Sequence, residues 1–398
     1  MAVFTEETQK KILAAMKETT ALTKIIANGW NVDSWKAVQT IVQAGAGEKY
    51  FPIGTQLNVA STTYGTLVFD VVAHNHHKNP NNANAPTMTL LQHDVIYGRQ
   101  FDAAELLWAN TTDSELPAGT YNLTGYKSTY DQSTTEDGTF QITTTKAIPV
   151  GGGFRHSQIG AWRSGGAYSK DTVLSGKWTT YDASGNVLES NLATTEGMDG
   201  TSLGTYSVAQ TNIINTIGSF NSTHRQIYGS NNWAESAIRQ WINSDKDASA
   251  WWSKQTIFDL KPSYIGTKGY IADLDTEFVS VLGEVDNITK HNTVFEIGGT
   301  RGGSYTTRDK FFLLSRDELG YGIESGIAEG SVLEFYENAT NTDRIKYDVS
   351  AKTTARFWWM RSPNSWVAGH ARLVTTAGAI NSYLAYDGYG AAPACIIY

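Results

Sequence analysis

Apolar residues recur at helical spacing near the start of the chain. Residues 5–28 open with Thr5 and two glutamates, which suit a helix N-terminus, and carry an imperfect apolar stripe that predicts a helix. Residues 34–44 repeat this spacing over a shorter length and stop at Gly45. We expect two helices, which either pack on the following domain or form a stalk for oligomerisation or attachment.

From residue 50 the apolar pattern changes to alternation, which is typical of strands. The segments 52–59, 64–74 and 88–98 each alternate, and we interpret them as the first strands of a domain. From there to about residue 200, β-branched and polar residues alternate between glycine turns. That region indicates a β-rich insertion or a separate small domain.

Helical spacing returns in the second half of the chain. Residues 230–244 place two tryptophans on one face, with Ser230 or Asn231 as the expected cap. We expect residues 246–258 to continue this helical layer. Residues 310–322 predict a buried strand followed by a turn.

The last stretch of the chain, residues 356–398, has three chemical parts. An apolar opening at 357–360 and an apolar ending at 393–397 both predict buried strands. The middle is rich in Asn, Ser, His, Asp, Gly and Tyr, which indicates a pair of surface loops. Tyr with Ser, Gly and Asn is also the residue mixture of a binding surface, because Tyr supplies contact area at low entropic cost.

The residue types that are missing from this stretch fit a particular kind of codon randomisation. From Arg361 to the end there is no Lys, Glu, Gln or Met. Codons AAC or AAT that are randomised at their adenines never encode these four residues or Trp, and the polar middle nearly keeps to that alphabet. Trp366 is the exception and would have to be supplied by the template.

The motifs FWWMRSP, LVTTAGAIN and GAAPACII resemble the variable region of proteins that retroelements diversify in gut bacteria and their phages. The resemblance is strong over residues 311–398 and weaker before them. It implies a C-type-lectin-like fold that displays variable residues at a ligand-binding surface, often at a phage tail tip. We therefore expect an α+β, mainly β chain with a C-type-lectin-like C-terminal domain, a β-rich insertion or extra domain and a short N-terminal helical segment.

On this interpretation the chain has three regions. Residues 1–45 are a helical oligomerisation or attachment segment, and residues 46–200 are a β-rich region with the start of the lectin-like domain. Residues 201–398 are the lectin-like domain, with the variable region at 361–390. Arg361 is expected to be structural, paired or bonded to carbonyls beneath the site. The expected ligand contacts are Asn364, Ser365, Trp366, Ala368, His370, Asn381, Ser382, Tyr383, Tyr386, Asp387 and Tyr389.

The expected function is that of a non-enzymatic receptor-binding protein of the diversified type, at a phage tail tip or fibre and assembled in the host cytoplasm. Its partner would be a bacterial surface receptor, protein or glycan, engaged by a homotrimer whose identical heads add avidity. No cofactor, metal or catalytic residue is expected. Two alternatives stay open: a tail-associated glycan hydrolase with a carboxylate pair, and a bacterial surface adhesin of the same fold, which the missing signal peptide disfavours.

The composition of the chain restricts the kinds of partner that it can bind. The 398 residues carry a net charge of −8 and show no basic stripe, which argues against nucleic acid. No run of eighteen apolar residues occurs, so no membrane insertion is expected. The single cysteine, Cys395, excludes an intrachain disulfide and is expected to be buried.

The sequence gives weaker support to a calcium site, another metal site or a glycosidase site. The calcium-binding triplets of sugar-binding lectins, Glu-Pro-Asn and Trp-Asn-Asp, do not occur. The histidines that cluster in sequence open an Asn-rich loop without cysteine, and we predict no metal there; they are His74, His76, His77 and His93. A glycosidase needs two carboxyls facing each other across a cleft. The pairs available for that alternative, all in turn-like contexts, are Asp113/Glu115, Glu136/Asp137 and Glu334/Glu337.

Overall fold

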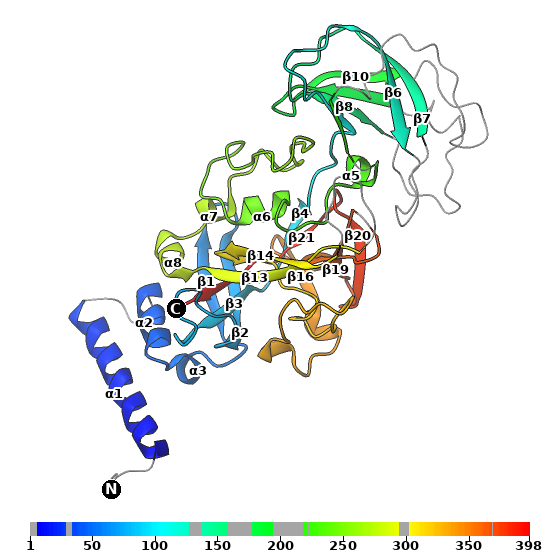
Figure 1. The fold of residues 1–398 in the computed structure, drawn as a ribbon. Helices are drawn as coiled ribbons and strands as arrows, with labels where there is room; N and C mark the ends of the chain where they lie inside the picture. Colours follow the sequence, from blue (N-terminus) through cyan, green and yellow to red (C-terminus); the bar gives the residue numbers. More distant parts are fainter. Residues whose placement is uncertain are drawn as a thin grey trace.

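The computed structural model describes residues 6–28, 34–126, 137–157, 177–193, 218–221, 223–293, 302–367 and 369–398. The described chain is mainly β with short helices, so the α+β class expected from the sequence is confirmed. Figure 1 shows an N-terminal helix at one end, a central body that contains two sheets, and a smaller β module at the other end.

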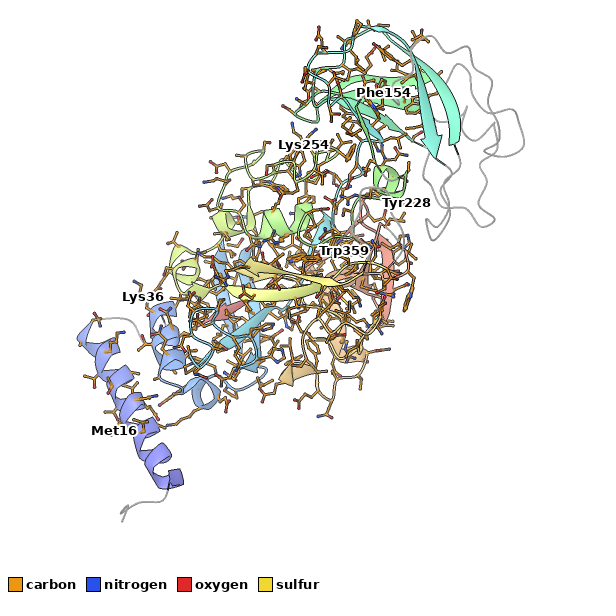
Figure 2. The ribbon with its side chains drawn as sticks, in the orientation of Figure 1. Met16, Lys36, Phe154, Tyr228, Lys254 and Trp359 are labelled. Atoms are coloured by element: carbon orange, nitrogen blue, oxygen red, sulfur yellow. The ribbon has the colours of Figure 1, made fainter. Side chains whose placement is uncertain are left out.

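Both predicted N-terminal helices form. The first, α1 (Glu6–Ala27), projects away from the body, and its Met16 side chain is 62% exposed (Figures 1 and 2). Thr5, its expected cap, lies outside the described residues. The second helix, α2 (Trp35–Gln43), is capped by Ser34, whose Oγ accepts a hydrogen bond from the Ala37 N–H. A one-turn helix, α3 (Gly47–Tyr50), follows.

The two helices pack differently. Helix α2 lies on the body, because Val38 and Val42 are buried and the Trp35 ring is 4.6 Å from the Phe278 ring. Helix α1 is held by fewer contacts: Ala21 is buried, and Glu18 accepts hydrogen bonds from Lys49 and from Tyr50. Helix α2 therefore packs on the body, and the role of a stalk stays a prediction for α1.

The first sheet of the body joins the beginning and the end of the chain. Its path runs β1-β2-β3-β22-β12, with β15 pairing to β22. Cys395 in β22 lies opposite Leu90 in β3, and both are buried. The buried strands expected at 393–397 and 310–322, and the buried cysteine, are thereby confirmed. The bounds are β1 (Gln56–Ser61), β2 (Gly65–His74), β3 (Met88–Gln92), β12 (Leu282–Gly283), β15 (Phe311–Phe312) and β22 (Ala394–Ile397).

The second sheet carries the terminal stretch and runs β20-β19-β18-β21-β4. The polar middle, expected as surface loops, forms three of these strands, because pairing with β18 and β4 satisfies its backbone groups. The single strand expected at 88–98 is two strands, β3 and β4, in different sheets. The bounds are β4 (Ile96–Gln100), β18 (Trp358–Pro363), β19 (His370–Val374), β20 (Ile380–Leu384) and β21 (Gly388–Ala391).

The helices that cover the sheets are shorter than expected. The segment 230–244 contains only α6 (Ala237–Ile242), capped by Ser236 rather than Ser230, because the Ser230 and Asn232 side chains hold the preceding residues in turns. The helix expected at 246–258 is absent; there Asp259 accepts backbone hydrogen bonds from two residues of a turn. The other short helices are α5 (Thr223–Tyr228), α7 (Tyr270–Asp273), α8 (Thr276–Ser280), η2 (Glu334–Tyr336) and η3 (Thr342–Arg344).

Two hairpins complete the body, and the β module stands apart from it. The hairpins are β13 (Val285–Lys290) with β14 (Ser304–Asp309), and β16 (Lys346–Asp348) with β17 (Ala351–Arg356). The module has a five-stranded sheet, β10-β9-β8-β5-β11, and the hairpin of β6 (Gly119–Tyr126) and β7 (Asp137–Thr144). The sheet strands are β5 (Trp108–Ala109), β8 (Gly153–His156), β9 (Lys177–Tyr181), β10 (Val187–Ala193) and β11 (Ser219–Phe220).

The module has its own aromatic core around Trp108, Phe154 and Trp178, with the rings of Trp108 and Phe154 5.4 Å apart (Figure 2). Its first and last strands, β5 and β11, are paired neighbours, so the chain enters and leaves the module at one place. Among the described helices of the whole chain, none has both the length and the apolar character that a membrane span needs.

Candidate ligand-binding surface

The terminal sheet is built on a rigid central strand. All six residues of β18 are buried, and Figure 2 places Trp359 in the middle of the body. The indole N–H of Trp359 donates to the Arg99 carbonyl at 2.8 Å, and that of Trp358 to the Arg344 carbonyl at 3.0 Å. Because both indoles are hydrogen-bonded inside the core, β18 offers a fixed support for its neighbours.

Arg361 anchors this strand to the loop beneath it. Its guanidinium is buried and forms a bidentate pair with Glu318, at 2.6 Å and 2.9 Å, and also donates to the Leu313 and Glu329 carbonyls. Burial alone would raise the pKa of Glu318, but the Arg361 charge and the hydrogen bond with His77 lower it well below its usual range. The structural role expected for Arg361 is confirmed.

One face of the sheet carries a tyrosine cluster. The Tyr383 ring lies 5.7 Å from Phe357 and 5.5 Å from Tyr389, and Tyr389 contacts Trp359 at 5.1 Å. Asn381, at the exposed end of β20, lies opposite Leu373 on this same face. The two tyrosines are half-buried and pack against the hydrophobic core, so they are less exposed than the sequence predicted.

The opposite face carries a polar network around Glu324. Arg372, which pairs across the strands with Ser382, donates to Glu324 at 2.9 Å. The Ser365 N–H donates to the other oxygen of Glu324, also at 2.9 Å. Burial would raise the pKa of Glu324, but these hydrogen bonds and the nearby cations lower it to about 2, so the carboxylate stays charged.

Two predicted contacts belong to this network and not to the surface. Asn364 and Ser365 are buried, which corrects their assignment as ligand contacts. The Asn364 side chain donates to Ser382 Oγ at 2.8 Å, and the Ser365 carbonyl accepts from Thr293. They position the exposed Trp366, which is 54% exposed and has the Arg372 guanidinium 6.0 Å from its ring.

At the rim of the sheet, Tyr228 of α5 contacts two of the predicted residues, His370 and Tyr386. Its ring stacks on Tyr386 at 6.3 Å and meets His370 edge-on at 6.2 Å (Figure 2 labels Tyr228). Burial and the nearby Arg372 lower the pKa of His370 to about 4, so the imidazole is neutral at physiological pH. Burial raises the pKa of Asp387, which follows Tyr386 in the chain.

The predicted contacts are therefore distributed over two faces and a rim. Trp366 and Asn381 are exposed, and the half-buried group consists of His370, Ser382, Tyr383, Tyr386, Asp387 and Tyr389. Ala368 lies outside the described residues. Tyr228 was missed because it is more than 130 positions away in sequence, and no local pattern connects α5 to β19.

The histidines do not come together as a four-residue group. His74 bonds to the Phe51 carbonyl and His93 to Asp70, whereas His76 and His77 approach Glu318, with their ligand atoms within 4.8 Å of one another. Glu318 already pairs with Arg361 and accepts the Ser315 N–H, so a metal ion there would have to displace a satisfied ion pair. We assign no metal to this cluster.

Four of the six carboxylates that the hydrolase alternative requires lie at the surface. Asp113, Glu115, Glu334 and Glu337 are all exposed, and the side chain of Asp137 is not among those described. Glu136 lies outside the described residues.

Comparison with known proteins gives one match. Residues 205–398 match the model of a family described as a domain of unknown function (DUF6273). No curated protein and no solved structure matches the chain. The matched range contains β18 to β22 and therefore most of the candidate surface, whereas β1 to β4, which complete both sheets of the body, precede it.

Proposed function

We propose that this chain is a non-enzymatic receptor-binding protein whose contact surface is the terminal sheet with its Trp366 and Tyr228 borders. One observation carries the proposal: side chains of paratope-like composition lie exposed or half-buried on the sheet that is built on the fully buried β18. Such a surface tolerates change at its exposed positions because the supporting strand is held independently by Trp358, Trp359 and Arg361.

The finer identity rests on the sequence motifs. The terminal motifs and the restricted residue alphabet support a C-type-lectin-like variable protein of the retroelement-diversified type. In that role it would reside at a phage tail tip and bind a bacterial surface receptor, either a protein or a glycan. The partly exposed aromatic residues fit either partner, since aromatic side chains dominate the energetics of many interfaces.

The binding proposal is tested with fluorescently labelled protein on a panel of intact gut bacterial strains, measured by flow cytometry. We expect Trp366→Ala, Asn381→Ala and Tyr386→Ala to reduce binding by graded amounts, the aromatic changes most. Tyr347→Ala is the matched control, because this exposed tyrosine of β16 lies outside the surface. Binding that all three surface variants leave unchanged would overturn the assignment of the surface.

The diversification proposal has its own test at the level of the gene. We expect the neighbouring DNA to carry a near-copy of the segment that encodes residues 361–398, differing only at adenines, beside a reverse-transcriptase gene. A locus with neither feature contradicts retroelement diversification. It does not bear on the binding proposal, which the flow-cytometry assay tests separately.

A further inference from the structure

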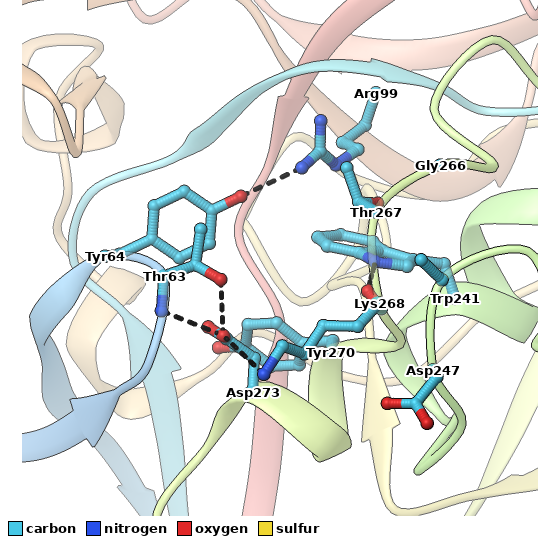
Figure 3. Close-up of a pocket in the computed structure, with 11 residues that line it drawn as sticks. Thr63, Tyr64, Arg99, Trp241, Asp247, Gly266, Thr267, Lys268, Tyr270 and Asp273 are labelled. Carbon is cyan, nitrogen blue, oxygen red and sulfur yellow. Dashed lines mark hydrogen bonds and ion pairs between the residues drawn. The ribbon is translucent and has the colours of Figure 1, made fainter.

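A cavity of about 430 Å³ opens on the body, and its lining contains none of the predicted contact residues. The elements around it are the β1–β2 turn, β4, α6, α7 and the loops before α7 (Figure 3). Its volume falls within the usual range of small-molecule sites. The residues that decide its chemistry are Tyr64, Arg99, Trp241, Asp247, Lys268 and Asp273.

Arg99 is the unusual member of this lining. It is only 8% exposed, yet no carboxylate of the described residues forms an ion pair with it. Its Nη2 donates to the Tyr64 hydroxyl at 2.9 Å, its Nη1 reaches the Tyr97 carbonyl only at 3.4 Å, and its Nε has no acceptor. A buried guanidinium in this state is incompletely compensated, since burying a charge is costly unless it is paired.

Aromatic rings hold Arg99 in place from the side. Its guanidinium carbon lies 4.6 Å from the centre of the Trp241 ring and 5.1 Å from that of Tyr264. These contacts stabilise a cation but accept no hydrogen bond in its plane. The edge of the guanidinium therefore still lacks a strong acceptor.

The buried carboxylate of the cavity, Asp273, already has hydrogen-bond partners of its own. Asp273 accepts hydrogen bonds from the hydroxyls of Ser61, Thr62 and Thr63, and Lys268 lies 3.9 Å from it and donates to Thr62. Burial would raise the pKa of Asp273, but these hydroxyl bonds lower it. Asp273 is therefore ionised and occupied, and it does not serve Arg99.

Asp247 lies at the opposite side of the cavity from Arg99 in Figure 3. It is exposed, and its carboxylate has no side-chain partner within the part of the chain that the structure describes. A free carboxylate accepts two hydroxyl groups at once. Between Arg99 and Asp247 the wall is aromatic, with Trp241 and Tyr270.

We propose that this cavity binds an acidic sugar, with the sugar carboxylate beside Arg99 and its hydroxyls toward Asp247. A carboxylate gives the guanidinium the charge-assisted acceptor that it lacks. Asp247 accepts the hydroxyls of the sugar and disfavours a small dianion such as phosphate. This site borders the terminal sheet at β4, where Arg99 pairs with Tyr389 of β21, and neither proposal depends on the other.

The test is isothermal titration of the full chain with D-glucuronate, N-acetylneuraminate, D-glucose and inorganic phosphate. We expect saturable binding of at least one of the two acidic sugars, and at least about tenfold weaker binding of glucose, which has no carboxylate to pair with Arg99. Failure of both acidic sugars to bind, or equal binding of glucose or phosphate, overturns the proposal.

Variants locate the binding in the cavity. Arg99→Met should weaken acidic-sugar binding by about tenfold or more, and Asp247→Asn should weaken it without affecting the fold. Asp245→Asn is the matched control, because this exposed aspartate two positions away does not line the cavity. If Arg99→Met fails to fold, Asp247→Asn against Asp245→Asn decides: equal affinity in those two variants contradicts the site.

Discussion

At the residue scale, Arg361 and Trp366 show how the same short stretch serves two purposes. Arg361 is buried with its charge paired to Glu318, while Trp366 projects into solvent five positions later. The change from support to surface takes place within the turn that Asn364 and Ser365 hold. Substitutions at these positions should therefore have separate effects on stability and on binding.

We predict that Arg361→Met lowers the free energy of unfolding by about 3–5 kcal/mol, because it leaves the buried Glu318 without its cation. Trp366→Ala should change that free energy by no more than about 0.5 kcal/mol. Urea denaturation measures both. The control is Arg308→Met, which removes an exposed ion pair with Asp286 and should have little effect. Equal losses for Arg361→Met and Arg308→Met would contradict the anchoring role.

His370 should make stability depend on pH. Burial lowers its pKa to about 4 in the folded chain, whereas the unfolded value is about 6.5. The unfolded state then binds more protons between these values, so this contribution is complete above pH 6.5 and is lost as the pH falls toward 4. His370→Gln should flatten the fall in Tm between pH 6.5 and 4.5, as seen by thermal denaturation. A Tm profile identical to that of the unmodified chain would show that His370 does not cause the dependence.

At the element scale, the strands of the terminal sheet sort the polar residues. Alternate side chains of a strand point to opposite faces, so Tyr383 joins the aromatic cluster while Ser382 joins the Glu324 network. A loop pair would have imposed no such alternation. Changes at even and odd positions of β20 are therefore expected to affect different neighbours.

Helix α1 carries exposed apolar residues that a second subunit would cover. Its Leu13 and Met16 are exposed, and an isolated helix in water needs packing to persist. We predict that the full chain is a homotrimer through α1, and that Leu13→Glu with Met16→Glu converts it to a monomer in multi-angle light scattering.

The control for this test is Ile257→Glu, which makes the same kind of change at an exposed apolar residue of the body. That variant should remain trimeric. A monomeric mass for the unaltered chain, or trimers that survive both changes in α1, would refute the stalk.

At the scale of the whole molecule, the body is assembled from the two ends of the chain, and the β module lies between them in sequence. Leu107 and Asn221 are joined by a backbone hydrogen bond of 2.9 Å where the module begins and ends. Other side-chain contacts among the described residues also cross this boundary, including Arg155 to the Gln226 carbonyl, Lys254 to the Gly151 carbonyl and Lys261 to Asn186. The module therefore has the connections of an insertion.

We predict that replacing residues 108–220 by a short Gly-Ser turn leaves the body folded, because its two sheets contain no strand of the module. The near-ultraviolet circular dichroism of the body tryptophans and a cooperative thermal transition should persist. A Trp358→Ala version of the same shortened chain serves as the unfolding control, since loss of a buried Trp costs about 3–5 kcal/mol. A shortened chain that behaves like this control would mean that the body needs the module.

Local periodicity and residue chemistry were enough to predict several elements from the sequence. The two N-terminal helices, the buried strands at both ends of the terminal stretch, the buried Cys395 and the structural Arg361 were all predicted correctly. Each depends on apolar spacing, a capping residue or the cost of burying a charge, and all of these act over a few neighbouring positions.

The contacts between distant segments of the chain could be seen only in the folded structure. Pairing of β3 with β22, the approach of Tyr228 to His370, and the cavity around Arg99 all join segments that lie far apart in the chain. Strand pairing turned expected loops into strands, because backbone groups that find a neighbouring strand adopt its register. Hydrogen bonds to Ser382, Glu324 and Thr293 hold Asn364 and Ser365 in their buried positions. Long-range contacts of this kind leave no periodic trace in the sequence, since they depend on how the sheets are assembled.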